Sequence, residues 1–342
     1  MDPFKKRQLG QSSVSLPQFG FGGAGLGNLF EDLEEATADD TLAAAWDEGV
    51  RYYDTSPWYG RGLSEHRFGR ALFRKPRDEF ILSTKVGRLF SAPRDIAAFA
   101  ASERAWNHGL EFEHRHDYTY EGVMRSFEDS LQRLRMNRID LLIIHDLDSL
   151  VLGSERLVDA HLNQLATGGI VALQELKASG RIKAIGAGVN QIGTIPRFLE
   201  VLDLDFFLVA LPYTLAEQPV LDVEFPLCEK RGVGVIIGAV FASGILATGA
   251  VPGAHLNYRD PTEEEADRIR RIEAVCKTFE TPLAAAALQF TLHHPAVASI
   301  IPGAIHPSQV KRNIELFRHE TPAELWAHLK NEGLLRGDAP TP

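Results

Sequence analysis

The sequence predicts an α/β protein built as a single (β/α)8 TIM barrel over residues 1–342, with an N-terminal hairpin and a C-terminal tail. Three observations lead to this prediction. Eight short apolar segments recur along the chain, and each is followed by a segment with helical spacing of apolar residues. The units are evenly spaced, and no change in composition divides the chain. A length of 342 residues also suits one large barrel.

The predicted strands follow a small hairpin expected at residues 7–16. We expect them at residues 18–22, 51–54, 80–84, 139–144, 182–187, 206–211, 233–237 and 297–301. Most of these segments are rich in Val, Ile, Leu and aromatic residues without polar alternation. This composition is typical of parallel strands that are buried on both faces.

The predicted helices alternate with these strands. They are expected at residues 38–48, 64–73, 120–134, 172–179, 195–202, 220–230, 263–279, 283–293 and 308–317. Ser64 is a candidate N-cap of the second helix. Residues 87–119 are polar, aromatic and irregular, and an irregular segment of this length is usually functional, so we expect an insertion that covers the substrate. The tail from Thr321 onward is expected to pack across one face.

Composition excludes several classes of partner. Hydrophobic residues make up 44% and charged residues 24%, which is ordinary for a globular protein. A net charge of −10 disfavours a nucleic-acid partner. The uncharged residues 232–251 match a membrane span in length, but their glycines favour a buried strand and a loop. With no secretory signal and two cysteines that we interpret as free thiols, we expect a cytoplasmic protein acting on a small molecule, without a membrane partner. The sequence does not predict an oligomeric state.

Four residues at the ends of predicted strands carry the chemistry: Asp54, Tyr59, Lys85 and His145. Alone, each has an ordinary explanation, such as a turn cap, a packed aromatic, a surface lysine or a strand-end histidine. Together they form a plausible proton-transfer set, because a lysine ammonium lowers the pKa of a nearby phenol from its usual value of ~10. A carboxylate would hold the lysine, and a histidine would orient the substrate oxygen.

At these residues the chain resembles the aldo-keto reductase superfamily. The matching features are Asp54-x4-Tyr59-Gly60, Ser64-Glu65, Thr84-Lys85, residues 138–141 with His145, residues 177–186, residues 244–249, and residues 301–303 with Asn313. The resemblance implies a (β/α)8 barrel and NAD(P)-dependent oxidoreduction. It also implies that Tyr59 is the acid/base, with Asp54, Lys85 and His145 in supporting roles.

Four further segments resemble a narrower group of dehydrogenases, at residues 144–148, 185–191, 243–250 and 284–290. The group comprises D-threo-aldose, L-fucose and galactose dehydrogenases, together with pyridoxal 4-dehydrogenases. This implies oxidation of a cyclic hemiacetal, such as L-fucose, D-arabinose or galactose, to its lactone. The alternative is oxidation of pyridoxal to 4-pyridoxolactone. Either substrate would use an aromatic platform, for which Trp58, Phe90 and Trp106 are candidates.

A third hypothesis is that the protein is not mainly an enzyme but a binding module that senses the cofactor and has little turnover. Channel-associated members of the superfamily are of this kind. No targeting or partner-binding segment of this sequence supports it.

The cofactor phosphates of such a barrel are expected near the loops after strands seven and eight. Small residues and backbone N–H groups there suit a pyrophosphate, and the candidates are Phe241, Ser243, Gly244, Leu246 and Gly303. By resemblance, Gly303, Gln309 and Asn313 line the adenosine end. Residues 303–306 hold no Lys or Arg to pair with a 2′-phosphate, so we expect NAD, with NADP as the alternative.

The nicotinamide end departs from the family pattern. Asn190 is the candidate partner of the nicotinamide amide. The glutamine that the family carries after strand six is replaced by Ala210, and Gln191 is a possible substitute for it. The aromatic residue that the family stacks on the nicotinamide is replaced by Gly238, and Tyr213 or Phe241 could take its place.

A glycine-rich motif and a group of histidines could suggest other binding sites. The G-x-G-x-x-G pattern at residues 20–25 lacks the helix that a dinucleotide fingerprint requires, so we interpret it as a Gly-rich loop that brings Gly22 near the nicotinamide. No metal site is predicted, because His114, His116, His293 and His294 lack metal-ligand spacing.

Overall fold

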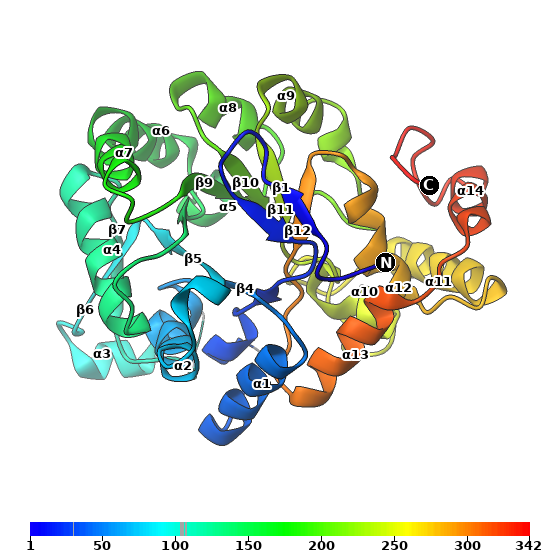
Figure 1. The fold of residues 1–342 in the computed structure, drawn as a ribbon, viewed down its shortest axis with the longest axis horizontal. Helices are drawn as coiled ribbons and strands as arrows, with labels where there is room; N and C mark the ends of the chain where they lie inside the picture. Colours follow the sequence, from blue (N-terminus) through cyan, green and yellow to red (C-terminus); the bar gives the residue numbers. More distant parts are fainter. Residues whose placement is uncertain (30, 103–105, 107) are drawn as a thin grey trace.

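The computed structural model describes residues 1–29, 31–102, 106 and 108–342. Its centre is one sheet of eight parallel strands in the order β12-β11-β10-β9-β8-β5-β4-β3 (Figure 1). The first and last strands of this order meet, because Phe19 pairs with Ile300 and Gly22 with Gly303 in parallel bridges. The sheet is therefore closed, and the predicted (β/α)8 barrel is confirmed.

All eight strands lie within or beside the predicted segments. They are β3 (Phe21–Gly22), β4 (Tyr52–Asp54), β5 (Ile81–Val86), β8 (Leu141–Ile144), β9 (Ala184–Val189), β10 (Phe206–Val209), β11 (Gly234–Ile237) and β12 (Val297–Ile300). Strand β9 has glycine at position 186 because the large Phe206 ring of the neighbouring strand β10 packs against it. A Cβ at Gly186 would approach the Phe206 ring to 2.5 Å.

The predicted helices form the outer layer. They are α1 (Glu35–Asp47), α2 (Leu63–Leu72), α4 (Tyr120–Leu134), α7 (Ile170–Ala178), α8 (Thr194–Val201), α9 (Glu224–Arg231), α11 (Glu263–Thr278), α12 (Leu283–Phe290) and α13 (Pro307–Arg318). The prediction missed α5 (Ser149–Leu152), α6 (Glu155–Gln164), α10 (Ile245–Thr248) and α14 (Ala323–Asn331). It was also wrong about Ser64, since α2 begins after Gly62 and no side chain caps it. The Ser64 hydroxyl instead donates to the Gly23 carbonyl oxygen at 2.8 Å.

The insertion between β5 and α4 has more regular structure than predicted. Strands β6 (Arg88–Ser91) and β7 (Glu113–His116) form an antiparallel pair in which Arg88 faces His116 and Phe90 faces His114. The short helix α3 (Ile96–Ala101) follows β6. The hairpin holds its aromatic and basic side chains on a defined frame beside the ends of the barrel strands.

The N-terminal hairpin closes one end of the barrel. Strands β1 (Lys6–Gln8) and β2 (Ser15–Pro17) pair as predicted, and they lie across the barrel in Figure 1. Buried side chains of this hairpin join the apolar interior of the barrel, which contains Leu9, Val14, Leu16, Tyr52, Leu141, Ile143, Ala184, Phe206, Leu208, Ile236, Ala298 and Ile301. Burial of this apolar surface stabilises the closed sheet and leaves only the opposite end for chemistry.

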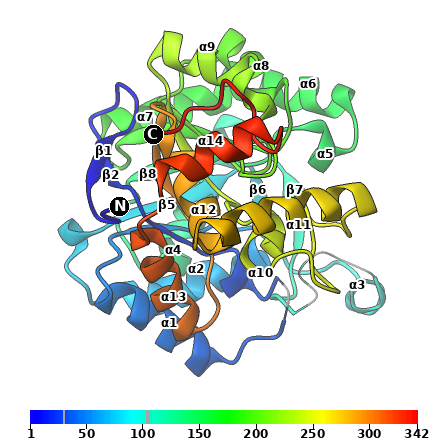
Figure 2. The same cartoon turned by 90° about the vertical axis from the view of Figure 1, so that its right-hand side faces the viewer.

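The C-terminal tail packs on the outside of the barrel, as expected. Helix α14 lies beside α11 (Figure 2), and its Trp326 is buried. The Arg268 guanidinium of α11 donates to the Leu334 carbonyl oxygen at 2.7 Å.

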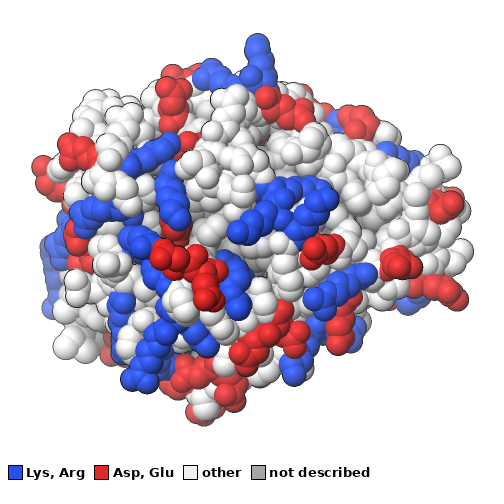
Figure 3. Space-filling model, in the orientation of Figure 1, with Lys and Arg blue, Asp and Glu red and all other residues white. Residues whose placement is uncertain are grey.

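The surface carries both signs of charge. Lysine and arginine lie among aspartate and glutamate over the face that Figure 3 shows. In the described part of the chain, no helix is long and apolar enough to cross a membrane.

Closure of the barrel predicts a strict requirement for glycine at position 22. A Cβ there would lie 2.6 Å from the Ile301 carbonyl oxygen, which is backbone and cannot move aside cheaply. We expect Gly22→Ala to lower the free energy of unfolding by about 1–3 kcal/mol, measured by urea denaturation. The matched control is Gly337→Ala, where a Cβ would meet nothing within 4 Å. Equal stability of the two variants would contradict the close approach of β3 and β12.

Candidate active site

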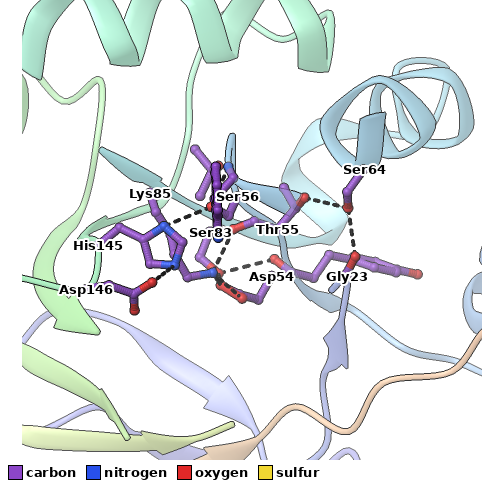
Figure 4. A network of polar contacts seen from close by, with 12 residues as sticks. Gly23, Asp54, Thr55, Ser56, Ser64, Ser83, Lys85, His145 and Asp146 are labelled. Atoms are coloured by element: carbon purple, nitrogen blue, oxygen red, sulfur yellow. Dashed lines mark hydrogen bonds and ion pairs between the residues drawn. The ribbon is translucent and has the colours of Figure 1, made fainter. Parts of the chain in front are cut away.

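The register of neighbouring strands gathers three of the four predicted catalytic residues at one end of the barrel. Asp54 ends β4 opposite Ser83 of β5, and Lys85 lies opposite Ile143 of β8. His145 directly follows β8. Tyr59 begins the short 3₁₀ helix η2 (Tyr59–Gly62) after β4. Figure 4 shows the polar network that joins Asp54, Lys85 and His145 to their neighbours.

Asp54 and Lys85 form a buried ion pair, and each side chain is 1% exposed. Lys85 Nζ lies 2.7 Å from Asp54 Oδ1 and 3.1 Å from Oδ2, and it also donates to the Thr55 carbonyl oxygen at 2.8 Å. The Ser83 hydroxyl donates to Asp54 Oδ2 at 2.8 Å. Burial raises the pKa of Asp54, and the Lys85 ammonium opposes part of that shift.

Tyr59 lies next to this pair. Lys85 Nζ is 4.6 Å from the centre of the Tyr59 ring, and the His145 ring stands edge-on to it with centroids 5.9 Å apart. Burial and the negative charges of Asp54 and Asp146 raise the pKa of Tyr59. The net shift is therefore opposite to the one expected from Lys85, because burial is its largest cause and the two carboxylates add to it.

His145 has a partner at each ring nitrogen. Nδ1 lies 2.8 Å from Arg88 Nη1 and 3.0 Å from Ser56 Oγ, and Nε2 lies 3.1 Å from Asp146 Oδ2. Burial, with the positive charges of Arg88 and Lys85, keeps the pKa of His145 well below its ordinary value. The imidazole is therefore neutral at physiological pH.

The sequence did not reveal three neighbours of this group. Arg88 begins β6 and is almost fully buried, and Asp146 follows His145 with a positive φ of 44°. Tyr258 lies on a tight turn in which Leu256 and Arg259 pair, and its charge contributes to the raised pKa of Tyr59. Asp146 could have been predicted, because it directly follows His145 in the sequence. Tyr258 could not, because its loop is positioned by packing between segments that are far apart in the chain.

The three predicted substrate residues, Trp58, Phe90 and Trp106, lie near Tyr59 together with His114, which was not predicted, and we call these four residues the aromatic wall. Trp106 lies 5.7 Å from Tyr59 between ring centroids. His114 lies 4.4 Å from Trp58 and 6.5 Å from Phe90. Burial lowers the pKa of His114 to about 4, so the wall is uncharged at neutral pH.

Most of the predicted phosphate and adenosine residues lie together on the loops after β11 and β12. Ser243 and Gly244 have φ values of 65° and 112°, and the space where Gly244 would carry a Cβ is open. Asn313 Nδ2 donates to the Gly303 carbonyl oxygen at 3.3 Å, and Gln309 Oε1 accepts from the Ile305 N–H at 2.8 Å. Small residues beside an open backbone turn fit a dinucleotide pyrophosphate.

Gly22 and Leu246 also belong to the predicted cofactor-binding residues. Gly22 lies beside them, since it pairs with Gly303. The Leu246 side chain is fully buried in α10, and its backbone N–H donates to the Phe241 carbonyl oxygen at 3.1 Å.

Tyr213, a predicted stacking residue, lies inside the protein rather than on an open surface. Its ring is fully buried against Phe225 and Phe290 of the helical layer, with centroids 4.8 and 5.3 Å away. It therefore has no surface on which a bound ring could stack. Phe241, at the start of the loop after β11, is half-buried and stays a candidate.

The two amide candidates are already occupied. Asn190 Nδ2 donates to Asp146 Oδ1 and to Asp148 Oδ2, both at 3.0 Å. Gln191 Oε1 accepts from the Leu150 N–H at 3.0 Å. These bonds use the amide nitrogen of Asn190 and the amide oxygen of Gln191.

Comparison with known proteins agrees with this geometry. The model of the aldo/keto reductase family matches residues 18–331. The chain is 41% identical to pyridoxal 4-dehydrogenase of Microbacterium luteolum over 97% of its length and 98% of that protein. It is 38% identical to D-threo-aldose 1-dehydrogenase of a Pseudomonas species, over 97% of each chain. The holo form of an aldo-keto reductase from Bacillus halodurans superposes with a TM-score of 0.76, at 27% identity and 98% coverage of both chains.

The barrel and the strand-end site thus define an NAD(P)-dependent oxidoreductase. The chain belongs to the aldo/keto reductase family.

The buried ion pair predicts a large effect of Asp54 on stability. Asp54→Ala would leave a buried ammonium without its counter-ion, and we expect the free energy of unfolding to fall by about 3–5 kcal/mol in urea denaturation. Asp54→Asn, which keeps an acceptor for Lys85, should lose less. The control is Asp129→Ala, which removes an exposed partner of Arg125 and should cost less than about 1 kcal/mol. Similar losses for Asp54→Ala and Asp129→Ala would contradict the assignment.

Proposed function

We propose that the protein oxidises a cyclic hemiacetal to its lactone, with Tyr59 accepting the hydroxyl proton. The observation that carries the proposal is the meeting of Tyr59, the Asp54–Lys85 pair and the neutral His145 beside one aromatic wall. When bound, the nicotinamide dinucleotide supplies the hydride acceptor. The residues of this chain bind and orient the substrate and move one proton.

Each side chain has a distinct part in the proton transfer. The His145 Nε2–H orients the substrate hydroxyl toward Tyr59, in place of its present partner Asp146. Tyr59 removes the hydroxyl proton as the carbonyl bond forms. Lys85, fixed by Asp54 at 2.7 Å, holds positive charge beside the ring and stabilises the phenolate that the reaction needs.

The direction of the reaction sets a pH dependence. Burial and neighbouring carboxylates raise the pKa of Tyr59, so the proton-accepting phenolate becomes more abundant as the pH rises. We expect the kcat for oxidation to increase toward alkaline pH.

Tyr59→Phe should reduce kcat at least 1,000-fold, within the range known for acid/base groups, while the cofactor dissociation constant changes less than about twofold. Retention of more than a tenth of the wild-type kcat would contradict the role of Tyr59.

Our first substrate class is an aldose such as L-fucose, D-arabinose or galactose. The D-threo-aldose dehydrogenase relative supports it, and the flat face of a sugar ring packs well against Trp58 or Trp106.

Pyridoxal is the second candidate, and one specific observation favours it. The wall offers two tryptophans, a phenylalanine and a neutral histidine, which suit an aromatic ring. The relative with 41% identity is named for this substrate. Both candidates would present a hemiacetal hydroxyl to Tyr59 and give up the hydride of the same carbon, so they share the same chemistry.

We propose NAD as the preferred cofactor. Residues 303–306, just before α13, hold no Lys or Arg, so a 2′-phosphate there would lack a charge-assisted partner. Lys311 and Arg312 are exposed further along this helix.

One panel of assays tests substrate and cofactor together. NAD+ and NADP+ are each combined with L-fucose, D-arabinose, D-galactose, L-galactose and pyridoxal, and kcat/KM is measured for all ten pairs. We expect turnover of at least one hemiacetal, with NAD+ at least as efficient as NADP+. A hundredfold preference for NADP+ would overturn the NAD assignment. Cofactor binding with no turnover of any substrate would favour a cofactor-sensing module.

A further inference from the structure

Arg88 is the least expected member of the site, since it comes from the insertion rather than from a barrel strand. Its side chain is 2% exposed, and its guanidinium lies 4.9 Å from the centre of the Trp58 ring. Nη1 reaches His145 Nδ1 at 2.8 Å, and Nη2 reaches Asp146 Oδ2 at 3.2 Å. A buried guanidinium in contact with both an imidazole and the carboxylate beside it has a strong effect on the proton of that imidazole.

The hydrogen bond to Nδ1 decides which ring nitrogen carries the proton. Arginine has N–H donors and no acceptor, so Nδ1 must present its lone pair to Arg88. The Ser56 hydroxyl at 3.0 Å from the same nitrogen would not decide this, because a hydroxyl either donates or accepts. The proton of neutral His145 is therefore on Nε2, which lies 3.1 Å from Asp146 Oδ2.

Arg88 also changes what Asp146 does to His145. A lone carboxylate 3.1 Å from Nε2 would favour an imidazolium and hold it in an ion pair. Here the same carboxylate receives Arg88 at Oδ2 and Asn190 at Oδ1, so its charge is shared among three partners. A substrate oxygen can then replace Asp146 at the Nε2–H without separating an ion pair.

We propose that Arg88 is a positioning residue that fixes His145 as the neutral Nε2–H tautomer and compensates Asp146, so that the Nε2–H is available to the substrate oxygen. The inference deepens the proposed function and rests on it for the role of His145. Arg88 itself acts through His145 and transfers no proton.

Among the charged and titratable groups around His145, Arg88 is the one whose substitution tests the proposal. His145 faces Lys85 from β5, Arg88 from β6, His116 from β7, Tyr59 from η2 and Asp146 from its own loop. Lys85 is paired with Asp54, and burial lowers the pKa of His116 to about 3, so His116 carries no charge at neutral pH. Arg88 is therefore the cation that opposes Asp146 directly at the imidazole.

The first test reads the tautomer without any activity. In ¹⁵N-histidine NMR of the intact protein, with His145 assigned by loss of its signals in His145→Gln, we expect an unprotonated Nδ1 and a protonated Nε2 from pH 5 to 8. A protonated Nδ1 in the wild type, or an imidazolium in this range, would overturn the proposal. Failure of the proposed substrates in turnover would leave this result unchanged, so the two failures are distinguishable.

The second test removes the guanidinium. In Arg88→Met we expect His145 to titrate between pH 5 and 8 and kcat to fall about 10- to 100-fold, while cofactor affinity is retained. Arg88→Lys keeps the charge, so it should keep His145 neutral and restore part of kcat even if Arg88→Met folds poorly. The matched control is Arg115→Met on the exposed side of the same hairpin, which should match the wild type in both readouts. An Arg88→Lys variant in which His145 titrates as in Arg88→Met would contradict the proposal.

Discussion

The buried ion pair of Asp54 and Lys85 is the constraint on which the site depends. Removing two charges from water costs several kcal/mol for each ion, and such a pair persists only where its remaining hydrogen bonds are satisfied. Here Lys85 has both Asp54 oxygens and the Thr55 carbonyl, and Asp54 also receives the Ser83 hydroxyl. These partners come from β4, from the loop after it and from β5. A shift of one residue in the pairing of β4 with β5 would therefore leave charges buried without partners.

The same pair determines the behaviour of Tyr59. Lysine beside a phenol lowers the pKa of the phenol only as far as its charge is not already compensated. Asp54 compensates Lys85 at 2.7 Å, and both Asp54 and Asp146 act on Tyr59 as negative charges. The resting protein thus holds Tyr59 as the neutral phenol, poised as an acid. Its use as a base therefore depends on the Lys85 ammonium, 4.6 Å from the ring centre, which stabilises the phenolate as it forms.

Sequence patterns identified what depends on local spacing. The eight strands and most outer helices were predictable because apolar periodicity and turn residues are local signals. The positions of Asp54, Lys85 and His145 were predictable because each stands at or next to the end of a strand, and Tyr59 follows Asp54 in the turn after β4. The pairing of β6 with β7 was not, since Glu113, His114 and His116 give no alternating apolar pattern. Neither was the burial of Tyr213, because it depends in part on Phe290, which comes from α12 much later in the chain.

The departure from the family pattern at Asn190 and the presence of Arg88 are linked through one carboxylate. Asp146 Oδ2 accepts from Arg88 and lies 3.1 Å from His145 Nε2, while Oδ1 accepts from Asn190. Each donor lowers the negative charge that the carboxylate presents to the imidazole. Loss of either donor would therefore strengthen the effect of Asp146 on the Nε2 proton of His145. Asn190 and Arg88, from different parts of the chain, thus act on His145 through the same carboxylate.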